Sequence, residues 1–156
     1  MRKAVFFLFF ALFFALRTLG QSCLPGGITF TSQAEIDNFK NNYPGCKVVA
    51  QVTINGTSIY NLDGLDEITT ISSGFEISNN NSLTNLNGLK SLDSVGHQFV
   101  IFQNNNLSDI SGLHKLRSVY ELDLWNNAAL PNLDGLENLS SITNIFGSSN
   151  IVNKTR

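Results

Sequence analysis

The feature that most constrains this chain is a pattern of glycine and apolar residues that recurs every 23 or 24 residues. Gly64, Gly88, Gly112 and Gly135 occupy equivalent positions, at spacings of 24, 24 and 23 residues. In each repeat a leucine follows the glycine, and apolar residues come three and six positions after that leucine. One turn of such a chain cannot bury its apolar residues alone, so the pattern predicts a solenoid of stacked turns.

Each repeat also contains a short stretch in which apolar residues alternate with polar or variable ones. The apolar pairs of these stretches are Val52/Ile54, Phe75/Ile77, Phe99/Ile101 and Leu122/Leu124. A period of two is typical of a β-strand. We therefore predict a mainly β protein, a right-handed parallel solenoid of 23–24-residue coils whose strands stack into one parallel sheet.

An asparagine lies three residues after the second apolar residue of most strands, at Asn80, Asn104, Asn127 and Asn150. The first repeat has Thr57 at this position. An inward-facing asparagine can satisfy backbone N–H and C=O groups in a bend, and stacked copies can bond to one another. We predict that these asparagines form a buried structural ladder. For the repeated glycines we expect a positive φ or a close approach between adjacent coils.

The first twenty residues differ in character from the rest of the chain. Arg2 and Lys3 precede an apolar run of about 13 residues, 4–16, and small residues follow. This run is shorter than the roughly 20 residues that a membrane-spanning helix needs. We predict a signal peptide at residues 1–20, and therefore an exported protein. An uncleaved anchor and a lipoprotein attached at Cys23 are the alternatives.

Residues 21–48 resemble an end cap more than a repeat. Cys23 and Cys46 are the two cysteines of the chain, and an even pair in an exported protein most simply forms a disulfide. Between them, Ser32 and Glu35 form an S-x-x-E capping box that predicts the start of a helix. We expect one apolar face on this helix, formed by Ile36, Phe39 and Tyr43. Residues 49–156 then contain four full coils and an incomplete fifth.

The distribution of charge argues against a nucleic-acid partner. Three of the 10 lysine and arginine residues lie in residues 1–20, whereas all 12 acidic residues follow that segment. The remaining chain is acidic, and phosphate binding needs a basic face. His97 and His114 are not spaced like metal ligands, and we interpret both as loop residues. No metal or other cofactor is expected.

The repeated pattern, a strand followed by asparagines and L-x-x-L-x-G-L-x-x-L-x-S-I, resembles the receptor L domain and the bacterial leucine-rich repeats. "ELDLWNN" (121–127) is similar to the leucine-rich motif, and "LSDISGLHKL" (107–116) resembles the internalin type. The cap, residues 23–46, is similar to the start of exported bacterial surface proteins with L-domain-like repeats. This resemblance covers residues 23–150 and implies a secreted or cell-surface location, a recognition function and no catalytic motif.

Outward-facing strand positions have no role in the core and are the candidate functional surface. The residues that adjacent coils would bring together there are Val100, Phe102, Asp123, Trp125 and Phe146. Contiguous exposed aromatic side chains usually mark an interface. We expect this face to bind a protein or a glycan at the cell surface, with Trp125 as the anchor. The alternatives are a surface that packs against a missing C-terminal segment, and a structural or adhesive scaffold without a discrete ligand.

A β-helix enzyme acting on polysaccharides is a remote alternative. Glycoside hydrolysis uses two carboxylates roughly 5 to 9.5 Å apart. Glu76 and Asp123 would face outward two coils apart, about 10 Å at the usual strand spacing, so we expect a non-catalytic protein. The fifth coil begins at Ile145 and stops at Arg156 without a cap. We therefore expect that the natural polypeptide is longer or that this end pairs with a partner.

Overall fold

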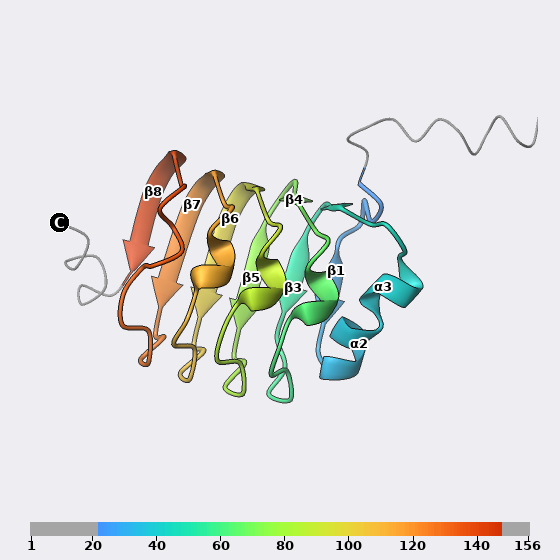
Figure 1. Cartoon of the computed structure of the whole chain (residues 1–156), viewed down its shortest axis with the longest axis horizontal. Coiled ribbons are helices and arrows are strands. Elements are labelled where there is room, and N and C mark those ends of the chain that lie inside the picture. Colours follow the sequence, from blue (N-terminus) through green and yellow to red (C-terminus); the bar gives the residue numbers. More distant parts are fainter. Residues whose placement is uncertain (1–21, 148–156) are drawn as a thin grey trace, which may run out of the picture.

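The computed structural model describes residues 22–147, which form a mainly β protein built on one eight-stranded sheet with parallel pairing (Figure 1). The strands lie side by side, with short 3-10 helices (η) along one side of the sheet and two α-helices beside β1. The elements are β1 (Ile28–Phe30), α2 (Gln33–Asp37), α3 (Phe39–Asn42), β2 (Val48–Val49), β3 (Val52–Ile54), η1 (Asp63–Leu65), β4 (Thr70–Ile71), β5 (Phe75–Ser78), η2 (Asn87–Leu89), β6 (Ser94–Phe102), η3 (Ser111–Leu113), β7 (Ser118–Trp125) and β8 (Ser141–Gly147). The predicted signal peptide lies outside the described residues. Within residues 22–147, no helix is long and apolar enough to cross a membrane.

The register of the sheet follows the sequence period. Val52 pairs with Phe75, Phe75 with Phe99, Phe99 with Leu122, and Leu122 with Ile145. Each paired residue is therefore 23 or 24 positions further along the chain. The prediction of a mainly β fold with a parallel sheet is confirmed. In addition, β1 pairs with β3, so the region predicted as a cap also contributes a strand.

Strand β6 joins two runs of strands into one sheet. Its first two residues pair with β4, whereas Phe99–Phe102 pair with β5. The register with β7 shifts between Val95 and Gln98, where β6 has one residue more than its partner. His97 lies in this irregular part of β6, so the prediction that it is a loop residue was wrong. The chain stays extended here, whereas the preceding segment separates β4 from β5 with a bend.

The inward-facing residues of the strands and the apolar residues of the 3-10 turns form one continuous core. Phe75 and Phe99 stack within it, with ring centroids 4.6 Å apart and an interplanar angle of 6°. Such aromatic pairs add to the free energy gained from burial alone. Toward β8 the equivalent side chains of residues 133–142 are only partly buried. The core is therefore best packed in the middle of the described sheet.

Buried asparagines connect successive segments of the chain. Asn80 and Asn104 are fully buried, and Asn127 is nearly so. The backbone N–H of Asn80 donates to Oδ1 of Asn104 at 3.0 Å, and that of Asn104 donates to Oδ1 of Asn127 at 3.1 Å. Their side-chain amides donate to the carbonyl oxygens of Ile54, Ile77 and Ile101, respectively. These bonds satisfy backbone groups where the sheet ends. The predicted fourth member, Asn150, lies outside the described residues.

The residue before each buried asparagine has a left-handed backbone. Its φ is 59° at Asn79, 54° at Gln103 and 52° at Asn126. The first repeat is one residue shorter here, and the N–H of Gly56 makes the equivalent bond to Oδ1 of Asn80 at 2.9 Å. The alignment of Thr57 with the asparagines was therefore wrong by one residue.

The repeated glycines permit close contact between successive segments. A Cβ atom at Gly64, Gly88 or Gly112 would lie 1.9, 2.0 or 2.0 Å from a carbonyl oxygen of the preceding segment. Among the four, only Gly135 combines close contact with a positive φ, 109°. We expected either a close approach between coils or a positive φ at these glycines. The close approach is found at all four, and the positive φ at Gly135 alone.

The helical part of the cap consists of two short helices that meet at Asn38. The Glu35 carboxylate accepts hydrogen bonds from the N–H groups of Thr31 and Ser32, as the capping-box motif predicted. These bonds lower the pKa of Glu35. Of the predicted apolar face, Ile36 and Phe39 are buried, and Tyr43, which is 36% exposed, packs its ring against Phe39 with the ring centroids 5.3 Å apart.

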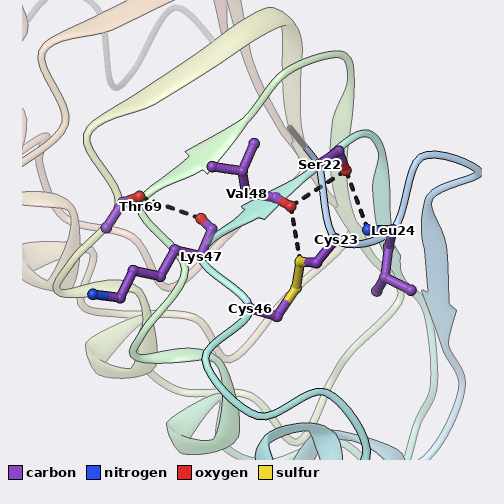
Figure 2. Close-up of a disulfide and its surroundings, with 7 residues drawn as sticks. All are labelled: Ser22, Cys23, Leu24, Cys46, Lys47, Val48 and Thr69. Carbon is purple, nitrogen blue, oxygen red and sulfur yellow. Dashed lines mark hydrogen bonds between the residues drawn. A yellow bond between two sulfur atoms is a disulfide. The ribbon is translucent and has the colours of Figure 1, made fainter. Parts of the chain in front are cut away.

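The predicted disulfide between Cys23 and Cys46 is present (Figure 2), with their Cα atoms 5.7 Å apart. The N–H of Cys23 donates to the carbonyl oxygen of Val48 at 2.9 Å. The hydroxyl of Ser22 donates to the same oxygen and accepts from the N–H of Leu24. The disulfide and these bonds fix the start of the described chain to β2 at the helical end of the sheet.

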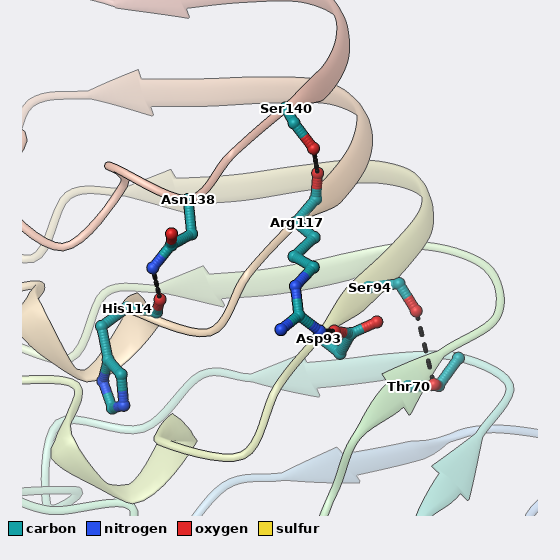
Figure 3. A network of polar contacts seen from close by, with 7 residues as sticks. All are labelled: Thr70, Asp93, Ser94, His114, Arg117, Asn138 and Ser140. Carbon is teal, nitrogen blue, oxygen red and sulfur yellow. Dashed lines mark hydrogen bonds and ion pairs between the residues drawn. The ribbon is translucent and has the colours of Figure 1, made fainter.

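Polar side chains also connect successive segments on the surface (Figure 3). The guanidinium of Arg117 forms an ion pair with Asp93 at 2.6 Å. Asn138 donates to the carbonyl oxygen of His114 at 2.7 Å, and Ser140 donates to that of Arg117 at 3.3 Å. Exposed pairs of this kind contribute little to stability individually. They add to the register that the buried asparagines already define.

Candidate functional site

The side of the sheet that faces away from the core presents three adjacent rows of side chains, which we call the outer face. Each row follows the strand register from one strand to the next, because alternate residues of a strand point to the same side. The rows are Gln51, Gly74, Gln98, Glu121 and Asn144; Thr53, Glu76, Val100, Asp123 and Phe146; and Ser78, Phe102 and Trp125.

The predicted apolar patch lies on β6 and β7. Phe102 is paired with Trp125, and Val100 with Asp123. Trp125 is 43% exposed, whereas Val100 and Phe102 are half-buried. Phe146 is paired with Asp123 through the backbone, and its side chain lies outside the described part. The sheet thus brings Val100, Phe102, Asp123 and Trp125 together, with Trp125 as the most accessible apolar group.

Asp123 is more enclosed than its outward position suggested. Only 9% of its surface is exposed. Nε2 of Gln98 donates to Oδ2 of Asp123 at 2.7 Å and to Oε1 of Glu121 at 3.1 Å. Within residues 22–147, Oδ1 of Asp123 is buried without a hydrogen-bond partner. Burial, and secondarily the charge of Glu121, raises the pKa of Asp123, while the bond from Gln98 opposes the shift. A ligand would therefore meet Trp125 before Asp123.

The outer face is acidic. Its charged side chains are Glu76, Glu121 and Asp123, and the described strands contain no lysine or arginine. Such a face repels phosphate and other anions and favours neutral or cationic ligands.

A shallow hollow lies beside the apolar patch on the same face. It has a volume of about 250 Å³ and is lined mainly by Gln51, Ser73, Gly74, Glu76, His97 and Gln98. It lies over Gly74, which has no side chain, and Gln51 and Gln98 flank it in the same row. Sequence reasoning missed this hollow, although a glycine directly before β5, in line with an outward row, was the available signal.

The carboxylates considered for the remote enzyme alternative are those of Glu76 and Asp123. Glu76 and Asp123 lie two strands apart with Val100 between them in the row. The carboxylate of Glu76 accepts a hydrogen bond from the hydroxyl of Ser78 at 2.6 Å. Across residues 22–147, no group of three or more histidine, cysteine, aspartate or glutamate side chains could hold a metal ion.

Comparison with known proteins gives no identification. No protein-family model, no curated protein and no solved structure matches this chain.

Proposed function

We propose that this protein is a secreted or cell-surface recognition domain that binds a protein or a glycan through its outer face, without catalysis. In this proposal the parallel sheet is one side of a right-handed solenoid of 23–24-residue coils, similar to the receptor L domain and the leucine-rich repeats. The repeated register and the close glycine contacts support the solenoid. The disulfide is compatible with an extracellular location.

The observation that carries the proposal is Trp125. It is 43% exposed and stands next to Phe102 and Val100 on a regular sheet. A large aromatic side chain on a rigid surface is a common anchor for a ligand, because it provides contact area at a small entropic cost. The acidic side chains beside it restrict the ligand to neutral or cationic chemistry.

The test is binding of the purified secreted chain to a glycan array and to cell-surface proteins, compared with the variants Trp125→Ala and Phe102→Ala. We expect saturable binding that weakens by at least about tenfold in the Trp125 variant, the loss typical of an interface anchor. The control is Tyr60→Ala, which removes another aromatic side chain, 55% exposed and outside the outer face. Equal binding by the wild type and the Trp125 variant, or no saturable binding by the wild type, would refute the proposal.

A further inference from the structure

We infer that the hollow over Gly74 is a subsite for one uncharged, hydroxyl-rich sugar ring of an oligosaccharide that also contacts Trp125. This inference rests on the proposed recognition function of the outer face and chooses a glycan as its ligand. The hollow exists because Gly74 has no side chain between Gln51 and Gln98. Its volume of about 250 Å³ is slightly below the roughly 300–1,000 Å³ of sites for drug-sized ligands, so it suits a single ring.

The polar side chains around the hollow include both donors and acceptors, since Gln51, Ser73 and His97 can each donate as well as accept. Nε2 of Gln98 already donates to Asp123 and Glu121, which uses both of its hydrogens. Gln98 can therefore offer a ligand its carbonyl oxygen. Glu76 is exposed and offers a carboxylate, and Ser73 offers a hydroxyl. Donors and acceptors side by side fit the hydroxyl groups of a sugar, which both donate and accept, and the local negative charge disfavours anionic sugars.

The hollow also offers an apolar contact, and its distance from Trp125 fits an oligosaccharide. Val100 is half-buried between the hollow and the apolar patch, and it can contact the C–H face of a ring. Trp125 lies two strands and four residues away from Gly74 in the register. At about 4.8 Å per strand and 3.3 Å per residue, this separation is roughly 16 Å. One sugar ring cannot span it, whereas a short oligosaccharide can contact both places.

The hollow can be filled without disturbing the backbone, which makes the inference testable. A Cβ atom at Gly74 would have its nearest contact at 3.8 Å, an ordinary van der Waals distance, and Gly74 has no positive φ. Gly74→Gln therefore places in the hollow the same residue type as its two neighbours in the row. The matched control is Thr29→Gln, an exposed position of β1 that pairs with Thr53 and does not line the hollow.

The experiment compares the wild type, Gly74→Gln, Thr29→Gln and Trp125→Ala on an array of neutral, amino and anionic oligosaccharides, with urea unfolding midpoints as the check on folding. We expect binding to neutral oligosaccharides that falls by at least about tenfold in the Gly74 variant and stays within about twofold in the Thr29 control. Glu76→Gln provides a second test, because it removes the charge without filling the hollow. We expect the Glu76 variant to bind anionic oligosaccharides less weakly, relative to neutral ones, than the wild type does.

The outcomes separate this inference from the proposed function. Loss of binding in Trp125→Ala with wild-type binding in Gly74→Gln would overturn the sugar subsite and leave the recognition function standing. A preference for anionic or amino sugars would also overturn it. So would saturable binding to proteins alone, which leaves recognition intact with a different class of ligand. No saturable binding to either class would refute both.

Discussion

Replacing Asn104 with alanine removes the middle of the buried asparagine ladder. Nδ2 of Asn104 donates to the carbonyl oxygen of Ile77 at 2.9 Å, and Oδ1 accepts from the N–H of Asn80 at 3.0 Å. An alanine at this position can make neither bond. Asn104 and Asn80 are both fully buried, so water cannot replace the lost partners without a change in packing.

The expected cost follows from counting the groups that lose a partner. A buried backbone donor or acceptor left unsatisfied costs about 1–3 kcal/mol. The N–H of Asn80 and the C=O of Ile77 both lose a bond, and the removed amide leaves a small void. We therefore expect Asn104→Ala to lower the free energy of unfolding by about 4 kcal/mol. That is a large fraction of the roughly 5–15 kcal/mol by which a typical domain is stable.

The assay is urea unfolding followed by circular dichroism, with the free energy obtained by linear extrapolation. The control is Asn106→Ala, because Asn106 is exposed and its amide donates to the carbonyl oxygen of Asn81 at 2.7 Å. We expect the control to change stability by less than about 1 kcal/mol. A loss for Asn104→Ala as small as that of the control would show that the ladder does not stabilise the fold in the way argued.

The remaining predictions concern one close contact and one buried acid. In Gly88→Ala the new Cβ would lie 2.0 Å from the carbonyl oxygen of Leu62, and overpacking of this kind should reduce the free energy of unfolding by about 3 kcal/mol. Gly26→Ala, with no atom within 4 Å of its Cβ, should be nearly neutral in the same urea experiment. Because the pKa of Asp123 is raised in the folded state, its contribution to stability should decrease as the pH rises through that pKa. Asp123→Asn should therefore gain stability relative to the wild type as the pH rises from below the ordinary aspartate pKa of about 3.9, and a pH-independent difference in unfolding midpoint would contradict the assignment.

The features that sequence reasoning predicted correctly are those that depend on one residue type at a fixed period. Val52, Phe75, Phe99 and Leu122 are buried because a strand places every second side chain on the same side and each repeat supplies an apolar residue there. Their pairing follows from the same period, since stacking equivalent residues buries every copy at once. The disulfide could be predicted because the chain has only two cysteines.

Features set by non-local neighbours could not be predicted in this way. Asp123 occupies an outward position, yet it is enclosed by residues of adjacent strands and held by Gln98. The register of the ladder depends on one additional left-handed residue. Asparagine at Asn79 and Asn126 favours that conformation, whereas glutamine at Gln103 gives little indication of it. His97 lies in a strand because β6 is continuous from Ser94 to Phe102. In the preceding repeat a bend divides the equivalent stretch into β4 and β5.

The distinction between repeated and unrepeated positions explains where function is to be sought in this molecule. Some residue types recur at the same position in every repeat, such as the glycine at Gly88. Contacts between neighbouring segments explain why that residue type is needed there. A residue that differs from its equivalents in the other repeats is not explained by those contacts. Gly74 interrupts a row of larger side chains, and Trp125 is paired with Phe102 in a row that has Ser78 on β5. Both departures lie on the outer face, where no packing requirement explains them, and for that reason they are the positions to change first.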